Sequence, residues 1–597
     1  MQATRLFDVL SDFQNSPKPD LFIAKENGAW RNYSSTEVFD LIQQLAAGLL
    51  AKGISANDFT VEKRDKIAIL SNSRPEWLIT DLAVQSTGAV LVPLYPNTSP
   101  NEVEKIFLES EVKFCFVNDK ITYDVIKSVQ PKVPSLQEIF VFEEVSGATN
   151  WKTILKPVGE TEKAQLTQIA DRTKTEDVAT IIYTSGTTGN PKGVMLTHKN
   201  IMSNLHGVEP IIESVIHTIP VAERRALSFL PLNHILEKMV TYVYLYHGIS
   251  IGYAENISTI AENLKELQPN VFVSVPRLLE KVYEKIMSTG NTLTGFKKWM
   301  FFKSLEVAEK FELNTTQPLF YRLQLAFFRK LVFTKWHEAL GGKVLGIVVG
   351  GAPMQVKLIR IFTAAGIPVI EGYGLTETSP VIAVNGYIEK DRKFGTVGRI
   401  IKSVEVKIAE DGEILTKSDS VMLGYYKQPA LTAEAVHDGW FATGDIGEIT
   451  ADSFLRITDR KKEIFKNSGG KYVAPQPIEN TLKGNPLIEQ VIILGPDRKF
   501  TSALIVPGFD SLKEWCNRNG LQITTREEII TNPKVVAEYK KIVDGFNPQF
   551  NHVEQVKKFT LIADEWSVET GELTPKMSMK RKFIMEKYLK QIDAMYA

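Results

Sequence analysis

A segment rich in glycine and hydroxyl groups follows an apolar stretch about a third of the way along the chain. Residues 178–183 are mostly apolar and predict a buried strand. The polar residues that follow are suited to phosphate, because glycines let backbone N–H groups approach, hydroxyls donate hydrogen bonds and a lysine adds positive charge. These residues are Thr184, Ser185, Gly186, Thr187, Thr188, Gly189 and Lys192. We predict a phosphate-binding loop here; a glycine-rich surface turn is the alternative.

This loop differs from the P-loop of nucleoside triphosphatases. Pro191 directly precedes Lys192, and Gly193 stands where the P-loop has a Ser or Thr that binds magnesium. A phosphate site of another class is therefore expected.

Two later segments place small residues at the ends of predicted strands, where a nucleotide can lie against the backbone. The strands are expected at residues 344–349 and 368–370. Tyr373 offers a ring that can stack on adenine, and Glu377 offers a hard oxygen for Mg²⁺. Taken singly, either segment is also compatible with a simple turn. The candidate residues in them are Gly351, Ala352, Glu371, Gly372, Tyr373, Thr376 and Glu377.

Two charged residues further on complete a candidate nucleotide site. Asp445 carries a carboxylate that suits ribose hydroxyls, and the guanidinium of Arg460 can reach ribose or phosphate. Arg460 lies in the charged run 458–463, which predicts a solvated linker. We place the domain boundary there, giving residues 1–458 and 459–597.

The elements that must position these groups alternate between strands and helices. Strands are expected at residues 66–70, 89–94 and 112–117, separated by single helices, and this pattern indicates βαβ crossovers and a parallel sheet. Ligands of such sheets bind beyond the carboxyl ends of the strands. After about residue 400 the strands shorten and predict antiparallel pairs, and the C-terminal part predicts a small α+β unit.

Composition excludes several classes of protein. Lys and Arg total 70, as do Asp and Glu, so no global field points to nucleic acid. The two cysteines and eight histidines show no metal-binding spacing. No apolar run reaches 18 residues, and the first thirty residues lack a signal core. We expect a cytoplasmic chain that touches the inner face of a membrane at most peripherally.

One segment, residues 295–336, combines basic and aromatic residues. Helices of this composition can lie in a membrane interface. The alternative is that its aromatic residues pack into the core while its lysines extend to solvent.

The four motif segments, in this order, resemble those of the adenylate-forming (AMP-forming) synthetases over nearly the whole chain. Within that superfamily the chain is most similar to long-chain fatty-acyl-CoA synthetases, on the segment 371–378, the insertion before Gly341 and the ending 573–575. The resemblance implies an α/β fold: a large N-terminal domain with parallel sheets in αβα layers and a small antiparallel, barrel-like part, then a small mobile α+β domain. It also implies Mg²⁺ as cofactor, ATP and coenzyme A as co-substrates, and a long-chain fatty acid as substrate.

The same resemblance implies roles for individual residues. Thr184 and Glu377 would hold Mg²⁺, and Thr376 would contact the α-phosphate. Asp445 and Arg460 would hold ribose, and Lys462 would mark the hinge. The residues expected around adenine are Gly351, Ala352, Glu371, Gly372 and Tyr373; those along the pantetheine path include Gly469 and Gly470.

His234 lies where the family carries a residue near the acyl carboxylate. A lone histidine after an apolar strand is also compatible with a purely structural role. A helix is expected at residues 237–247, next to His234 and along the acyl tunnel that the resemblance implies. This position favours a role of His234 near the acyl carboxylate.

The C-terminal motif departs from the family. Fatty-acyl members usually carry a lysine that approaches the α-phosphate, and Ser578 occupies that position here. Lys576 and Lys580 stand two residues to either side, and in an extended segment residues two apart face the same way. We predict that one of them, preferably Lys576, supplies the charge.

Two other functions remain open on the sequence. One is a ligase that delivers its acyl-adenylate to the phosphopantetheine of a carrier protein. The other is an inactive, membrane-associated lipid-binding homologue, supported only by Ser578. A homodimer is compatible with the sequence.

Overall fold

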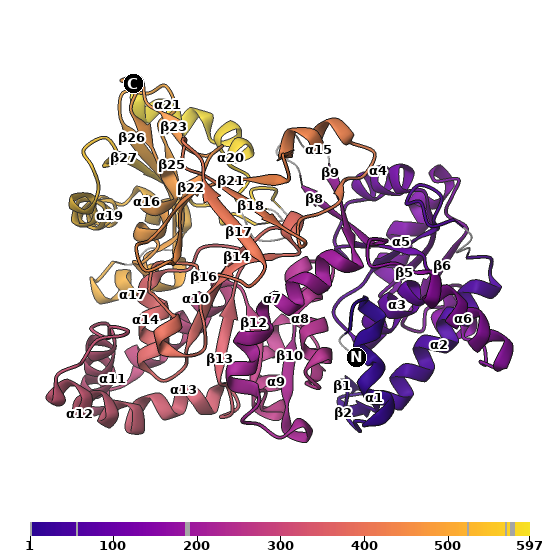
Figure 1. Ribbon diagram of the computed structural model, residues 1–597. Helices are drawn as coiled ribbons and strands as arrows, with labels where there is room; N and C mark the ends of the chain where they lie inside the picture. Colours follow the sequence, from indigo (N-terminus) through magenta and orange to yellow (C-terminus); the bar gives the residue numbers. More distant parts are fainter. Residues whose placement is uncertain (1–2, 55–57, 186–190, 522–524, 568–569, 574–578) are drawn as a thin grey trace.

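The computed structural model describes residues 3–54, 58–185, 191–521, 525–567, 570–573 and 579–597. Figure 1 shows two large α/β bodies side by side and a smaller unit that carries the C-terminus. Some predicted site residues lie outside the described ranges: Gly186, Thr187, Thr188, Gly189, Lys576 and Ser578.

Within the described residues, the first sheet has nine strands. Its central strands run parallel, whereas β2 at one margin and β15 and β16 at the other are antiparallel to their neighbours. In spatial order the strands are β16 (Arg399–Ile400), β15 (Val381–Val384), β14 (Val369–Gly374), β13 (Gly346–Val349), β12 (Val271–Ser274), β10 (Arg225–Ser228), β11 (Ser250–Tyr253), β1 (Phe22–Glu26) and β2 (Ala29–Tyr33).

The second sheet has eight strands in the described part of the chain. It is parallel from β8 to β7 and antiparallel at β9 and β19. In spatial order the strands are β19 (Gly424–Tyr425), β9 (Pro191–Thr197), β8 (Val178–Ser185), β4 (Val90–Leu94), β3 (Lys66–Leu70), β5 (Val112–Val117), β6 (Glu138–Val141) and β7 (Thr149–Asn150).

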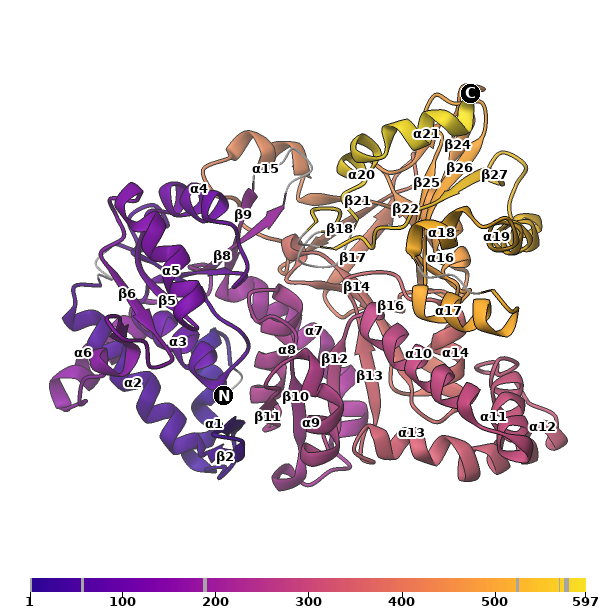
Figure 2. The ribbon, with the colours of Figure 1, turned by 180° about the vertical axis from the view of Figure 1, so that it is seen from behind.

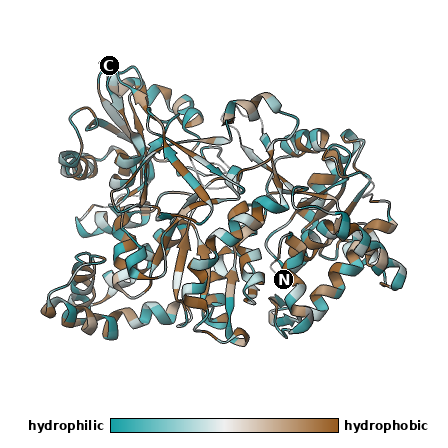
Figure 3. Cartoon of the chain, in the orientation of Figure 1, coloured by the Kyte–Doolittle hydropathy of each residue, from teal (hydrophilic) through white to brown (hydrophobic). Residues whose placement is uncertain are grey.

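The central strands of both sheets are apolar on both faces. Every residue of β3 and of β4 is buried, as expected for strands covered by helices on two sides. Figure 3 shows the same pattern, with brown, hydrophobic residues concentrated on the inner strands. The predicted αβα layering is confirmed.

Most of the helices connect these strands, and two of them begin at serine N-caps. Ser34 and Ser99 each accept a hydrogen bond from the N–H three residues on, at 3.1 and 3.3 Å. Helices α1 to α15 are Ser11–Asn15, Ser35–Ala51, Pro75–Ser86, Pro100–Ser110, Lys120–Val129, Glu160–Arg172, His198–Ile216, Ile235–Tyr246, Ile260–Leu267, Pro276–Thr292, Gly295–Ala308, Leu319–Phe328, Thr334–Ala339, Val356–Ala364 and Pro429–Ala435.

An antiparallel sheet and a separate C-terminal domain complete the fold (Figure 2), as predicted. The antiparallel sheet contains β17 (Val404–Ile408), β18 (Glu413–Ser418), β20 (Val436–His437), β21 (Trp440–Ile449) and β22 (Leu455–Arg460). The C-terminal strands are β23 (Phe465–Lys466), β24 (Tyr472–Val473), β25 (Ile488–Leu494), β26 (Thr501–Pro507) and β27 (Val556–Leu561). Its helices α16 to α21 are Pro475–Leu482, Phe509–Arg518, Arg526–Thr531, Pro533–Phe546, Arg581–Lys587 and Leu589–Tyr596.

The charged run at residues 458–463 is only partly the solvated linker that its composition predicts. Strand β22 continues through Arg460, and its alternation turns Asp459 inward, where it is fully buried. The Asp459 carboxylate accepts hydrogen bonds from the N–H of Arg460 (2.6 Å) and of Gln476 (3.4 Å), in the first turn of α16. Burial raises the pKa of Asp459 to about 7. The boundary at residues 458/459 stays a prediction.

The segment of residues 295–336 divides its aromatic residues between the core and the surface. Phe301 and Phe328 are buried in one hydrophobic cluster, whereas Phe296 and Trp299 are exposed and stack on each other with ring centroids 5.5 Å apart. Figures 1 and 2 both place α11 to α13 at the outer edge of the molecule. Among the described helices, none has the length and apolar character needed to cross a bilayer.

Candidate active site

The ends of β13 and β14 form one wall of the candidate site. These parallel strands pair Val349 with Glu371, so the turn after β13 and the continuation of β14 emerge at the same edge. A Cβ added at Gly350 would lie 3.7 Å from the Gly372 carbonyl oxygen, so the two backbones are neighbours at this edge. Gly351 has a φ of +83° and is exposed, as is Ala352, so both are accessible on this wall.

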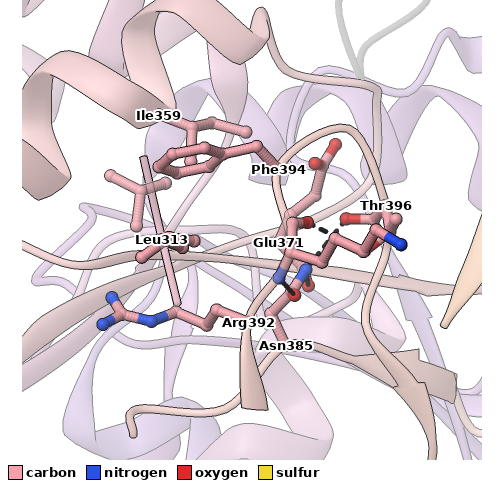
Figure 4. Close-up of a pocket in the computed structure, with 9 residues that line it drawn as sticks. Leu313, Ile359, Glu371, Asn385, Arg392, Phe394 and Thr396 are labelled. Atoms are coloured by element: carbon pink, nitrogen blue, oxygen red, sulfur yellow. Dashed lines mark hydrogen bonds between the residues drawn. The ribbon is translucent and has the colours of Figure 1, made fainter. Parts of the chain in front are cut away.

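Glu371 is one of the residues that line a small cavity (Figure 4). Its carboxylate accepts a hydrogen bond from the Met354 N–H at 3.1 Å, which fixes the turn after β13. Burial raises the pKa of Glu371 to about 7, and that hydrogen bond opposes the rise. The cavity is lined by Leu313, Ile359, Val369, Glu371, Asn385, Arg392, Lys393, Phe394 and Thr396.

Tyr373, Asp445 and Arg460 come together from three strands. The Tyr373 hydroxyl donates to Asp445 Oδ2 at 2.6 Å, and Arg460 Nε lies 3.5 Å from Asp445 Oδ1. The antiparallel register of β21 and β22 pairs Asp445 directly with Arg460. Burial raises the pKa of Asp445, while the Tyr373 hydrogen bond and the Arg460 charge lower it. Asp445, predicted to hold ribose, thus contacts Tyr373 of the predicted adenine residues and Arg460, the other predicted ribose residue.

The predicted phosphate loop joins the two strands of a hairpin. Thr184 on β8 lies opposite Lys192 on β9, and both side chains are half-buried. Ser185 is the last residue of β8. The hairpin therefore places the hydroxyl of Thr184 and the ammonium group of Lys192 at the same end of the second sheet.

Glu377 links the loop after β14 to the second sheet. Its Oε1 accepts a hydrogen bond from the Tyr425 hydroxyl at 2.9 Å, and its backbone oxygen accepts one from the Met422 N–H at 2.8 Å. Thr376 beside it is buried in a 3₁₀ turn, Thr376–Thr378. No local motif marks Tyr425 in the sequence, because its contact with Glu377 joins two distant segments.

His234 caps helix α8. Its Nδ1 accepts a hydrogen bond from the Leu236 N–H at 3.2 Å, which is a structural role. The helix start also adjoins the site, because a Cβ at Gly350 would lie 3.2 Å from Leu236 Cδ2. The predicted helix beside His234 is confirmed, and the role of His234 at the acyl carboxylate stays a prediction.

Other predicted residues lie on the C-terminal side. Gly469 and Gly470 form the turn between β23 and β24, and Lys462 is exposed just after β22. Lys580 is exposed at the start of α20, and its N–H donates to the Glu572 backbone oxygen at 2.7 Å. Among the described residues, no hydrogen bond or ion pair joins the Lys580 side chain to Glu377 or Asp445.

Two segments that together cover most of the chain match known families of domains. Residues 13–426 match the family described as AMP-binding enzyme, and residues 463–597 match the AMP-binding enzyme C-terminal domain. The chain belongs to the AMP-binding enzyme family. Most of the site described above lies within the first match.

The relatives of this AMP-binding enzyme include long-chain-fatty-acid–CoA ligases. The chain is 33% identical to "Long-chain-fatty-acid--CoA ligase FadD15" of Mycobacterium tuberculosis, over 97% of this chain and 95% of the relative. It is also 33% identical to "Long-chain-fatty-acid--CoA ligase 1" of Homo sapiens, over 95% of this chain and 82% of the relative.

Solved structures support the fold. ATP-bound MatB from Rhodopseudomonas palustris matches with a TM-score of 0.69 at 20% identity, over 98% of this chain and 99% of that one. MenE from Bacillus subtilis, in complex with ATP and magnesium ion, matches with a TM-score of 0.66 at 18% identity, over 97% of this chain and 98% of that one. At this identity the likeness concerns the fold alone.

The donor groups of this AMP-binding enzyme fit Mg²⁺ that is held partly by substrate phosphates. Mg²⁺ is usually bound through one or two carboxylates plus phosphate oxygens rather than by an all-protein cage. Glu377 offers one carboxylate whose orientation is fixed by Tyr425. In the described part of the chain, no cluster of three or more His, Cys, Asp or Glu could hold a metal ion.

Proposed function

We propose that the chain is an ATP-dependent long-chain-fatty-acid–CoA ligase. The observation that carries the proposal is the 33% identity to long-chain-fatty-acid–CoA ligases over nearly the whole chain. The contact among Tyr373, Asp445 and Arg460 supports it, because it assembles aromatic, acidic and basic groups suited to a nucleoside.

The first half-reaction joins the acid to AMP. The fatty carboxylate attacks the α-phosphorus of ATP, the bond to the β-phosphate breaks, and pyrophosphate leaves. Both reactants are anionic, so the protein mainly supplies positioning and positive charge. Lys192 would neutralise the phosphates, Thr376 would contact the α-phosphate, and Asp445 would hold the ribose. Mg²⁺ at Thr184 and Glu377 would stabilise the charge of the departing pyrophosphate.

The second half-reaction transfers the acyl group. The CoA thiol attacks the mixed anhydride, the thioester forms, and AMP departs with the electron pair of the broken bond. A protein nucleophile is not required. We propose that the C-terminal domain turns about Lys462 between the half-reactions, and that Gly469 and Gly470 then line the pantetheine path.

Pyrophosphate release tests the proposed function. The protein is incubated with ATP and Mg²⁺ and a panel of fatty acids from short to very long, each with and without CoA. We expect release that requires a long-chain acid and turns over only with CoA. Release without CoA-dependent turnover would favour a carrier-protein acceptor, and an absence of release with every acid would favour the lipid-binding homologue.

We also propose peripheral contact with anionic membranes through residues 295–336. Their surface combines apolar side chains with basic ones, the composition of an interfacial surface. Phe320 is 78% exposed and Phe296 is 69% exposed. The other exposed apolar residues here are Trp299, Leu319, Leu323, Phe327 and Leu331, and exposed basic residues include Lys297, Arg322, Lys330 and Lys335.

Sedimentation with vesicles of anionic lipid at low salt tests this contact. We expect part of the wild-type protein to sediment, and the variant Phe296→Ser/Phe320→Ser to stay in the supernatant, because two large apolar anchors are lost. The matched control is Ile121→Ser/Ile257→Ser, which removes two residues of similar exposure elsewhere. Wild-type protein that stays in the supernatant, or a control that behaves like the test variant, would contradict the proposal.

A further inference from the structure

Tyr425 lies between two groups that the proposed function assigns to the phosphate end of the nucleotide site. Its hydroxyl donates a hydrogen bond to Glu377 Oε1 at 2.9 Å. The Lys192 ammonium lies over its ring, 5.1 Å from the centroid, which is within the range of a cation–π contact. One buried side chain therefore contacts both the predicted metal ligand and the predicted phosphate-binding lysine.

The surrounding backbone holds Tyr425 in this position. Strand β19 pairs with β9 so that Tyr425 lies opposite Val194, two residues from Lys192 and on the same face of the strand. The Tyr425 N–H donates to Thr432 Oγ1 at 2.8 Å, in helix α15. The Met422 N–H, three residues earlier, donates to the Glu377 backbone oxygen.

We propose that Tyr425 is a positioning residue that couples the metal-binding carboxylate of Glu377 to the phosphate-binding lysine Lys192. The inference rests on the proposed function, because it assumes that both groups meet MgATP. The hydroxyl orients the carboxylate through one of its two oxygens, Oε1, and the other oxygen would then be available to the cation. The ring supports the ammonium group of Lys192 from one side.

The two contacts predict two separable effects on nucleotide binding. Hydrogen bonds that orient a ligating carboxylate are typically worth about 10–100-fold in metal affinity. The ring contact acts on Lys192 and therefore on the phosphates, whether or not metal is present. Loss of an ammonium–aromatic contact corresponds to about 2- to 30-fold in affinity.

Calorimetric titration of the full chain with ATP, in Mg²⁺ and separately in EDTA, tests the coupling without any turnover. For Tyr425→Phe we expect the Kd for MgATP to rise at least about 10-fold while the Kd for ATP in EDTA stays within about twofold. For Tyr425→Leu we expect both affinities to fall, because the ring is lost as well. Thermal unfolding of each variant verifies that the fold is retained.

Tyr426→Phe provides the matched control. Tyr426 is the buried neighbour in the same chain segment, and among the described residues its hydroxyl has no hydrogen-bond partner. Removing that hydroxyl should leave both titrations unchanged.

The outcomes separate this inference from the proposed function. If the wild-type protein binds MgATP and Tyr425→Phe binds it with the same affinity, the coupling is overturned and the proposed function is not. If Tyr425→Phe weakens ATP binding equally in Mg²⁺ and in EDTA, the coupling is also overturned, because general structural damage would lower both affinities. A wild-type protein that binds no MgATP would overturn the proposed function and the coupling with it.

Discussion

Replacing Glu377 by Gln is expected to slow pyrophosphate release by roughly 10²–10³-fold while the protein stays folded. The substitution keeps an oxygen that can accept the hydrogen bond from Tyr425, but it removes the negative charge proposed to hold Mg²⁺. Since charge on the departing pyrophosphate must be neutralised in the transition state, the loss should fall mainly on the chemical step. A single-turnover assay with saturating ATP and fatty acid measures it.

Glu434→Gln is the matched control for this prediction. Glu434 is an exposed residue of α15, on the segment that follows Tyr425, and its replacement by Gln removes the same charge. Among the described residues, no hydrogen bond or ion pair joins Glu434 to Glu377. The control should release pyrophosphate at the wild-type rate. If Glu377→Gln keeps more than about a third of the wild-type rate while Glu434→Gln is normal, Glu377 does not hold the metal.

The strand pattern of the large domain was predictable from the sequence, because buried parallel strands are apolar on both faces and leave a continuous signal. Residues 66–70 and 112–117 were expected as strands and form β3 and β5 with those bounds. The end of β14 was less predictable. Residues 372–374 continue the strand with two glycines, and only their pairing with β15 reveals it.

Side-chain contacts between distant segments account for what the sequence could not predict. Asp459 belongs to a run of charges that predicts solvent exposure, yet it is buried because α16 covers it. Tyr425 lies 48 residues after Glu377 in the chain, and its role depends on how the two large sheets meet. Composition likewise could not separate the buried Phe301 from the exposed Phe296.

In the candidate nucleotide site, too, the residue types were predictable from the sequence and the contacts between distant segments were not. The types of residue at Tyr373 and Asp445 predicted a nucleotide site, but their mutual hydrogen bond depends on the approach of β21 to the end of β14. The position of each motif was therefore predictable from the sequence. Which of their side chains form hydrogen bonds with one another was not.

Lys576→Ala is expected to slow formation of the acyl-adenylate by roughly 10²–10³-fold, the usual cost of removing a charge that stabilises a transition state. Lys576 lies outside the described residues, midway along the chain between Leu573 and Met579, which pair with each other as an isolated antiparallel bridge. Lys580 is the N-cap residue of α20, and its N–H donates a hydrogen bond to the Glu572 backbone oxygen. The sequence position and this anchoring favour Lys576 as the substitute for the family's lysine.

The two half-reactions distinguish this role from general damage. Pyrophosphate formation from ATP and fatty acid should fall in Lys576→Ala, whereas transfer of the acyl group from preformed acyl-AMP to CoA should proceed at the wild-type rate. Lys582→Ala is the control, since Lys582 is an exposed lysine of α20 to which no step is assigned. Near-normal adenylation by Lys576→Ala together with a large loss in Lys580→Ala would assign the charge to Lys580 instead, and equal losses in both half-reactions would mean that Lys576 supports the domain rather than the α-phosphate.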